Sequence, residues 1–87
     1  PDTDTFQALE LAYRAGRAGG SLPTVFNAAN EMAVAKFLDR KIRYLEITDL
    51  IGECMERHVN IPSPSLDEIL DTEAGVYEYI NSRLGRR

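Results

Sequence analysis

The stretch from residue 21 to residue 39 constrains this chain most. It is the longest run with helical spacing of its apolar residues and few charges. It contains no glycine, and its one proline, Pro23, falls in the first turn, where a missing N–H is tolerated. Residues three and four positions apart share one face of a helix. The face expected in the core consists of Leu22, Val25, Phe26, Ala29, Met32, Ala33 and Phe37. We expect this helix at the centre of the fold.

The other side of this helix carries Asn27, Asn30 and Glu31, and Val34 and Leu38 extend the same stripe. If the stripe is buried, its amides and carboxylate need partners, because an unsatisfied buried polar group costs roughly 1–3 kcal/mol. Those partners belong either to neighbouring loop ends of the same bundle or to a second domain or subunit. The mixture of polar and apolar side chains is more typical of a docking surface than of a catalytic pocket.

Turn and cap residues divide the rest of the chain into helices. Gly19-Gly20 ends the first helix, since glycine takes the left-handed conformation at a helix C-terminus without penalty. Residues 42–47 alternate like a strand but have no second strand to pair with, so we expect an extended connector there. The predicted helices span residues 5–18, 22–39, 48–58, 65–70 and 72–84. The expected N-caps are Asp4 or Thr5, Ser21, Thr48, Ser65, and Asp71 or Thr72.

Each of these helices has an apolar face that is expected to point inward. In the first helix it consists of Phe6, Leu9, Ala12, Tyr13 and Gly16. In the third it consists of Leu50, Ile51, Cys54, Met55 and His58, opposite a wet face of Asp49, Glu53, Glu56 and Arg57. In the last it consists of Val76, Tyr77, Ile80 and Leu84. The pattern predicts an all-α fold, a small bundle of about four helices.

Composition excludes several classes of protein. The 87 residues suffice for one small domain. The net charge is −4 and the basic residues are scattered, so sequence-independent binding of nucleic acid is not expected. No apolar run approaches the ~20 residues that a membrane span needs. The single cysteine cannot form an internal disulfide, which fits a reducing compartment.

No catalytic, cofactor-binding or metal-binding residue is predicted in this chain. His58 lies near the end of the third helix, where a capping or partly buried structural role is expected. Cys54 lies on an apolar face, where a thiol behaves as a small hydrophobe. The sequence has none of the paired cysteine or histidine spacings of metal sites, and its glycines match no nucleotide-binding loop.

An ordered series of short motifs carries a family resemblance. The motifs are Leu11-Ala12-Tyr13, Ala18-Gly19-Gly20, Pro23, Asn27-Ala28-Ala29-Asn30-Glu31, Ala33-Val34, Phe37-Leu38 and Ile42. In this order they resemble the C-terminal domain of the 1-deoxy-D-xylulose 5-phosphate reductoisomerase family. The resemblance covers essentially the whole chain and is densest from Gly19 to Ile47. Tyr44 stands where the family often has phenylalanine.

The resemblance implies a role within a larger enzyme. Enzymes of this family rearrange and reduce 1-deoxy-D-xylulose 5-phosphate to 2-C-methyl-D-erythritol 4-phosphate in non-mevalonate isoprenoid biosynthesis, with NADPH and magnesium or manganese. Their nucleotide, metal and substrate motifs belong to two preceding domains and are not in these 87 residues. Residues 1–87 would then be a single C-terminal helical domain, inactive alone, that braces the catalytic domain of the same polypeptide. The parent enzyme would be a homodimer in a bacterial cytoplasm or a plant plastid.

Within that interpretation, Asn27, Asn30 and Glu31 are the candidates for contact with the catalytic domain or for support of its site. The chain begins with Pro1 rather than methionine, which indicates a fragment of something longer. The alternative is a free-standing helical module that binds a partner protein through the same stripe. A longer reading frame with a preceding nucleotide-binding domain would favour the enzyme.

Overall fold

The computed structural model describes residues 3–85, and these form four helices without a strand. They are α1 (Thr3–Ala18), α2 (Leu22–Leu38), α3 (Tyr44–Arg57) and α4 (Leu66–Leu84). The predicted all-α fold is therefore confirmed. The Cα atoms span 35 × 33 × 17 Å, so the bundle is flat.

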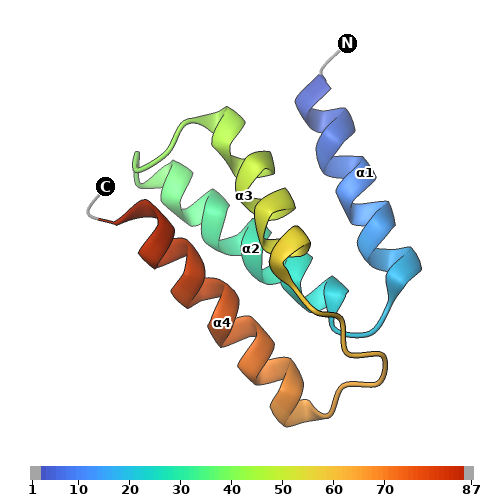
Figure 1. The fold of residues 1–87 in the computed structure, drawn as a ribbon. Helices are drawn as coiled ribbons and strands as arrows, with labels where there is room; N and C mark the ends of the chain where they lie inside the picture. The colour runs from blue at the N-terminus through green and yellow to red at the C-terminus, as the bar shows by residue number, and fades with distance from the viewer. Residues whose placement is uncertain (1–2, 86–87) are drawn as a thin grey trace.

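The second helix is the centre of the fold, as its sequence predicts. It contacts each of the other three helices, whereas α1 and α4 lie on opposite sides of the α2–α3 pair (Figure 1). Its buried side chains are small, with Val25, Ala28, Ala29 and Ala33 in the core. Small side chains let neighbouring helices approach closely while larger ones interlock around them. The larger core residues come mostly from α3 and α4: Leu50, Ile51, Met55, Val76, Ile80 and Leu84.

The first helix turns a different face to the core from the one expected. Leu11 and Ala15 are buried, whereas Phe6, Leu9 and Tyr13 are exposed. Leu9 and Leu11 are two residues apart, which places them about 200° apart around a helix. The sequence thus offers two apolar stripes, and contact with α2 and α3 selects the narrower one. The helix also begins at Thr3, before the expected caps Asp4 and Thr5.

The third helix begins earlier than predicted, so the expected connector over residues 42–47 is wrong. Its N-cap is Arg43, whose backbone N–H donates to Glu46 Oε1 at 2.9 Å. Thr48 lies inside the helix rather than at its cap. Six alternating residues fit fewer than two helical turns, and so short a pattern does not separate strand from helix.

The last two predicted helices, 65–70 and 72–84, are a single helix. Its start at Ser65 is confirmed: Ser65 Oγ accepts from the Glu68 N–H at 3.1 Å, and Glu68 Oε1 accepts from the Ser65 N–H at 2.9 Å. The expected second cap at Asp71 or Thr72 does not form. Thr72 Oγ1 instead donates to the Glu68 carbonyl at 2.7 Å, one turn back along the continuous helix.

Candidate functional site

The polar stripe of α2 is exposed, and its three candidate residues meet different surroundings. Asn27, Asn30 and Glu31 all face outward. Tyr77 Oη of α4 donates to Glu31 Oε1 at 3.0 Å, so Glu31 has a partner within the bundle. Partial desolvation and this carboxylate raise the pKa of Tyr77. Among the side chains described for residues 5–85, none forms a hydrogen bond with the side-chain amide of Asn27 or Asn30.

Asn30 differs from Asn27 because it opens into a groove. This hollow, which we call the α1–α3 groove, has a volume of about 240 Å³. Its walls come from the first half of α1, the middle of α2 and the first half of α3. The lining residues are Thr5, Ala8, Phe26, Asn30, Val34, Tyr44, Ile47, Thr48 and Ile51. Two members of the predicted stripe, Asn30 and Val34, therefore share a surface that Asn27 and Glu31 do not line.

A second polar cluster, which the sequence did not reveal, closes the other end of these helices. Ser21 is fully buried at the start of α2 and makes no capping bond of its own. The Ser21 and Leu22 N–H groups instead donate to Asn60 Oδ1, each at 2.9 Å. Asn60, from the loop between α3 and α4, thus takes the capping role expected of Ser21. The one sequence signal for this capping role is the position of Asn60 in a short loop before Pro62.

The Ser21 hydroxyl completes this cluster. Its Oγ accepts from the Ile61 N–H at 2.8 Å and lies 2.6 Å from His58 Nε2. Burial lowers the pKa of His58, which favours the neutral imidazole. His58 is the half-buried C-cap residue of α3, so the predicted position at a helix cap is confirmed. We call Gly20, Ser21, His58, Asn60 and Ile61 the loop clasp.

Gly20 makes the loop clasp possible. Its φ is +62°, a left-handed conformation that suits glycine. A Cβ on Gly20 would collide with the Ile61 carbonyl oxygen and meet Asn60 Oδ1 at 2.9 Å. The neighbouring Gly19 has a similar φ of +65°, but a Cβ there would meet nothing within 4 Å. The glycine pair therefore ends α1 and also gives the second loop room to approach.

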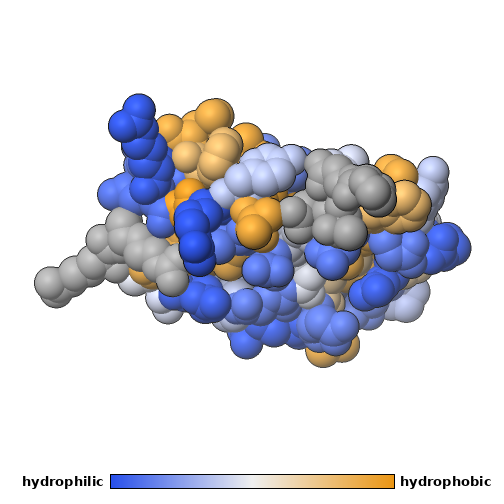
Figure 2. Space-filling model, turned by 90° about the horizontal axis from the view of Figure 1, so that it is seen from above, coloured by the Kyte–Doolittle hydropathy of each residue, from blue (hydrophilic) through white to orange (hydrophobic). Residues whose placement is uncertain are grey.

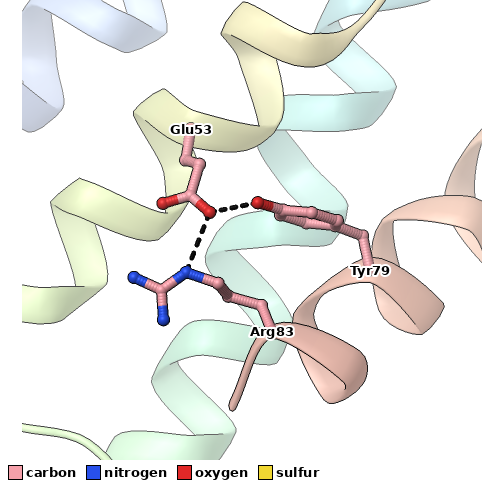
Figure 3. A network of polar contacts seen from close by, with 3 residues as sticks. All are labelled: Glu53, Tyr79 and Arg83. Carbon is pink, nitrogen blue, oxygen red and sulfur yellow. Dashed lines mark hydrogen bonds and ion pairs between the residues drawn. The ribbon is translucent and has the colours of Figure 1, made fainter. Parts of the chain in front are cut away.

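A third polar cluster joins α3 to α4. Tyr79 Oη and Arg83 Nε both donate to Glu53 Oε1, the latter at 3.0 Å (Figure 3). Hydrogen bonding to Glu53 raises the pKa of Tyr79. The Arg57 guanidinium lies over the Tyr79 ring, 3.9 Å from its centroid. Glu53, placed on a wet face by the sequence, is thus partly buried and fastens two helices together.

Cys54 and His58 line a hollow of about 190 Å³ between α3 and α4, yet they do not form a nucleophile–base pair. Burial, followed by the Glu53 charge, raises the pKa of Cys54 to about 11. The thiol is therefore protonated at neutral pH, as expected for a small buried hydrophobe. The Nε2 atom of His58 is already engaged by Ser21.

The described residues lack the features of a metal site, a dinucleotide-binding turn and a membrane-spanning helix. Among residues 5–85, no three His, Cys, Asp or Glu side chains form a group that could hold a metal ion. Those residues contain no strand from which a dinucleotide-binding turn could start. None of their helices is both long enough and apolar enough to cross a membrane.

Several known proteins contain a region whose sequence is similar to this chain. A family model described as the DXP reductoisomerase C-terminal domain matches residues 1–79. Proteins named 1-deoxy-D-xylulose 5-phosphate reductoisomerase from Agathobacter rectalis and Lachnospira eligens are 61% and 51% identical over 83 residues. The protein of the same name from Clostridium novyi is 46% identical over 83 residues. No solved structure matches the chain.

The extent of these matches defines what they show. Each of the three alignments covers 95% of this chain but only 22% of the relative. The chain therefore spans about a fifth of the length of the curated relatives that it matches. By the match of the family model and these identities, the chain belongs to the family of DXP reductoisomerase C-terminal domains.

Proposed function

We propose that this chain is the structural C-terminal domain of an NADPH-dependent enzyme that converts 1-deoxy-D-xylulose 5-phosphate to 2-C-methyl-D-erythritol 4-phosphate. The observation that carries the proposal is the family match over residues 1–79, together with relatives that bear the name of this enzyme. Its role is to brace the catalytic domain of the same polypeptide, and it performs no chemistry alone. The named relatives are bacterial, which favours the cytoplasm over a plastid. The proposal also takes the parent enzyme to be a homodimer.

NADPH and a divalent metal belong to the parent enzyme in this proposal, because the residues described here do not fit either group. The acidic side chains of residues 5–85 do not form a set of metal ligands. The one glycine pair, Gly19-Gly20, is packed by Asn60 and Ile61 rather than left open as a phosphate cradle. Binding of cofactor and substrate is therefore assigned to the part of the relatives that lies outside this match.

The bracing role is tested by removing the domain from the complete polypeptide. The shortened enzyme should melt at a lower temperature and lose turnover, because the catalytic domain loses the surface against which it packs. The 87-residue chain, mixed with NADPH, magnesium and the sugar phosphate, should oxidise no cofactor above background. Unchanged melting and turnover of the shortened enzyme would refute bracing. Turnover by the 87-residue chain would refute the assignment of chemistry to other domains.

A further inference from the structure

Two residues that line the α1–α3 groove, Val34 and Tyr44, belong to a set of exposed hydrophobic residues on the same three helices. Six large ones lie in the first half of α1, the second half of α2 and the first turn of α3: Phe6, Leu9, Val34, Leu38, Tyr44 and Leu45. In Figure 1 the first turn of α3 lies at the top of the bundle, between the start of α1 on the right and the end of α2 on the left. Figure 2, seen from above, shows most of the visible hydrophobic side chains toward one edge of the molecule and mainly hydrophilic ones along the opposite edge. Such a concentration marks a surface that has a partner.

The walls of the groove are held in place by the fold. Phe26, Ile47 and Ile51 pack with the core, and Ile51 is fully buried. Tyr44 is 53% exposed, yet its ring packs edge-on against Phe37, with centroids 5.6 Å apart. A half-exposed aromatic ring that is already held loses little conformational entropy when a partner covers it.

Asn30 gives the groove its one amide on largely apolar walls. A carboxamide offers both a donor and an acceptor, which matches the C=O and N–H of a peptide backbone. Thr5, Thr48 and the Tyr44 hydroxyl are the other polar groups of the lining, and none of the described residues that line the groove is charged. An extended peptide segment that inserts an apolar side chain fits this chemistry, whereas a phosphate or a charged sugar does not.

The comparisons indicate where such a segment comes from. The matched region is a fifth of each relative, and the family model names it a C-terminal domain, so most of each relative precedes it. The first turns of α1 form one wall of the groove. Because α1 begins at this wall, a segment that precedes it in the same polypeptide needs only a short connection to reach the groove.

We propose that the α1–α3 groove receives an extended, apolar segment of the catalytic domain that precedes this chain in the same polypeptide. This inference rests on the proposed function and narrows its contact surface. Asn30 and Val34 belong to the contact, whereas Glu31 serves the α2–α4 junction through Tyr77. Asn27 lies outside the groove.

Photocrosslinking in the complete polypeptide tests the proposal directly. Tyr44 is replaced by p-benzoylphenylalanine, and Tyr13, which is 58% exposed on α1 but outside the groove, serves as the matched position. The probe at position 44 should link to the preceding domain of its own chain, and the probe at position 13 should not. No link from position 44, or equal links from both positions, overturns the proposal. A link from position 44 to a second copy also overturns it.

A pair of arginine substitutions on neighbouring α2 residues supplies the control. Val34→Arg places a charge in the groove, while Ala35→Arg places the same charge on an exposed position outside it. Val34→Arg should abolish the crosslink from position 44, and Ala35→Arg should keep it. Retention of the link in both variants overturns the groove as the contact. If removal of the whole domain impairs the enzyme but position 44 never crosslinks, bracing stands and runs through another face.

Discussion

Two regions of the bundle differ in how their polar groups are satisfied. In the loop clasp, at one end of α1, α2 and α3, the polar groups form hydrogen bonds within the chain. In the α1–α3 groove, toward the other end, the Asn30 amide forms none with the described side chains. Buried Ser21 is bonded from three sides by residues of the α3–α4 loop. The side chain of Asn30, on the same helix, has no hydrogen-bond partner among the side chains described for residues 5–85, and it lies beside the exposed Val34 and Tyr44 in the groove. A polar group that is satisfied internally maintains the fold, whereas one left beside apolar walls is available to another surface.

Gly20→Ala should lower the stability of the chain most, because Gly20 lies in the loop clasp. The new Cβ would collide with the Ile61 carbonyl at a left-handed φ, so we expect the free energy of unfolding to fall by about 3 kcal/mol. Urea denaturation of the 87-residue chain measures it. Gly19→Ala, with a similar φ but open space, should cost only about 1 kcal/mol from backbone strain. Equal losses in the two variants would show that the close approach of the second loop contributes nothing.

Asn60→Ala tests whether Asn60, in the α3–α4 loop, caps the N-terminus of α2. It removes the acceptor of the Ser21 and Leu22 N–H groups, so we expect a loss of about 2 kcal/mol. Asn60→Asp keeps that acceptor at a helix N-terminus and should retain most of the stability. Thermal unfolding compares the three proteins. If Asn60→Asp lowers the melting temperature as much as Asn60→Ala does, Asn60 does not cap α2.

His58 gives the clasp a dependence on pH. Its pKa in the folded chain lies below the ordinary value of 6.5, because burial disfavours the charged ring. Its contribution is therefore present above about pH 6.5 and is lost as pH falls through the lowered pKa. His58→Gln should remove this part of the acid destabilisation. Stability curves of parent and variant that run parallel across this range would show that His58 does not titrate differently on folding.

Asn30→Ala should have the smallest effect on the 87-residue chain, and it sharpens the contrast between the two ends. An exposed substitution away from the core changes stability by no more than about 0.5 kcal/mol. In the complete enzyme the same change should lower the melting temperature or turnover while metal binding stays intact. Identical melting and turnover of the complete parent and variant would remove Asn30 from the contact.

Local sequence was enough to predict the fold class and most of the core. The periodicity of α2, α3 and α4 correctly placed Val25, Ile51 and Ile80 inside. The Ser65–Glu68 capping box was also correct, because its two bonds join residues three apart. The sequence correctly placed Asn27, Asn30 and Glu31 on one face of α2. It did not show that Glu31 bonds within the bundle while Asn30 lines the groove. That division depends on Tyr77, which is 46 residues from Glu31.

The sequence by itself determined that this chain is helical, that α2 is central, and which family it belongs to. These follow from patterns shorter than a helix and from the order of motifs along the chain. Only the tertiary structure decided which stripe of α1 faces inward and that Asn60 caps α2. It alone placed Asn30 in an apolar groove. Each of these features depends on contacts between segments far apart in sequence. Local propensity and periodicity allow more than one inward face and more than one cap, and tertiary packing selects among them.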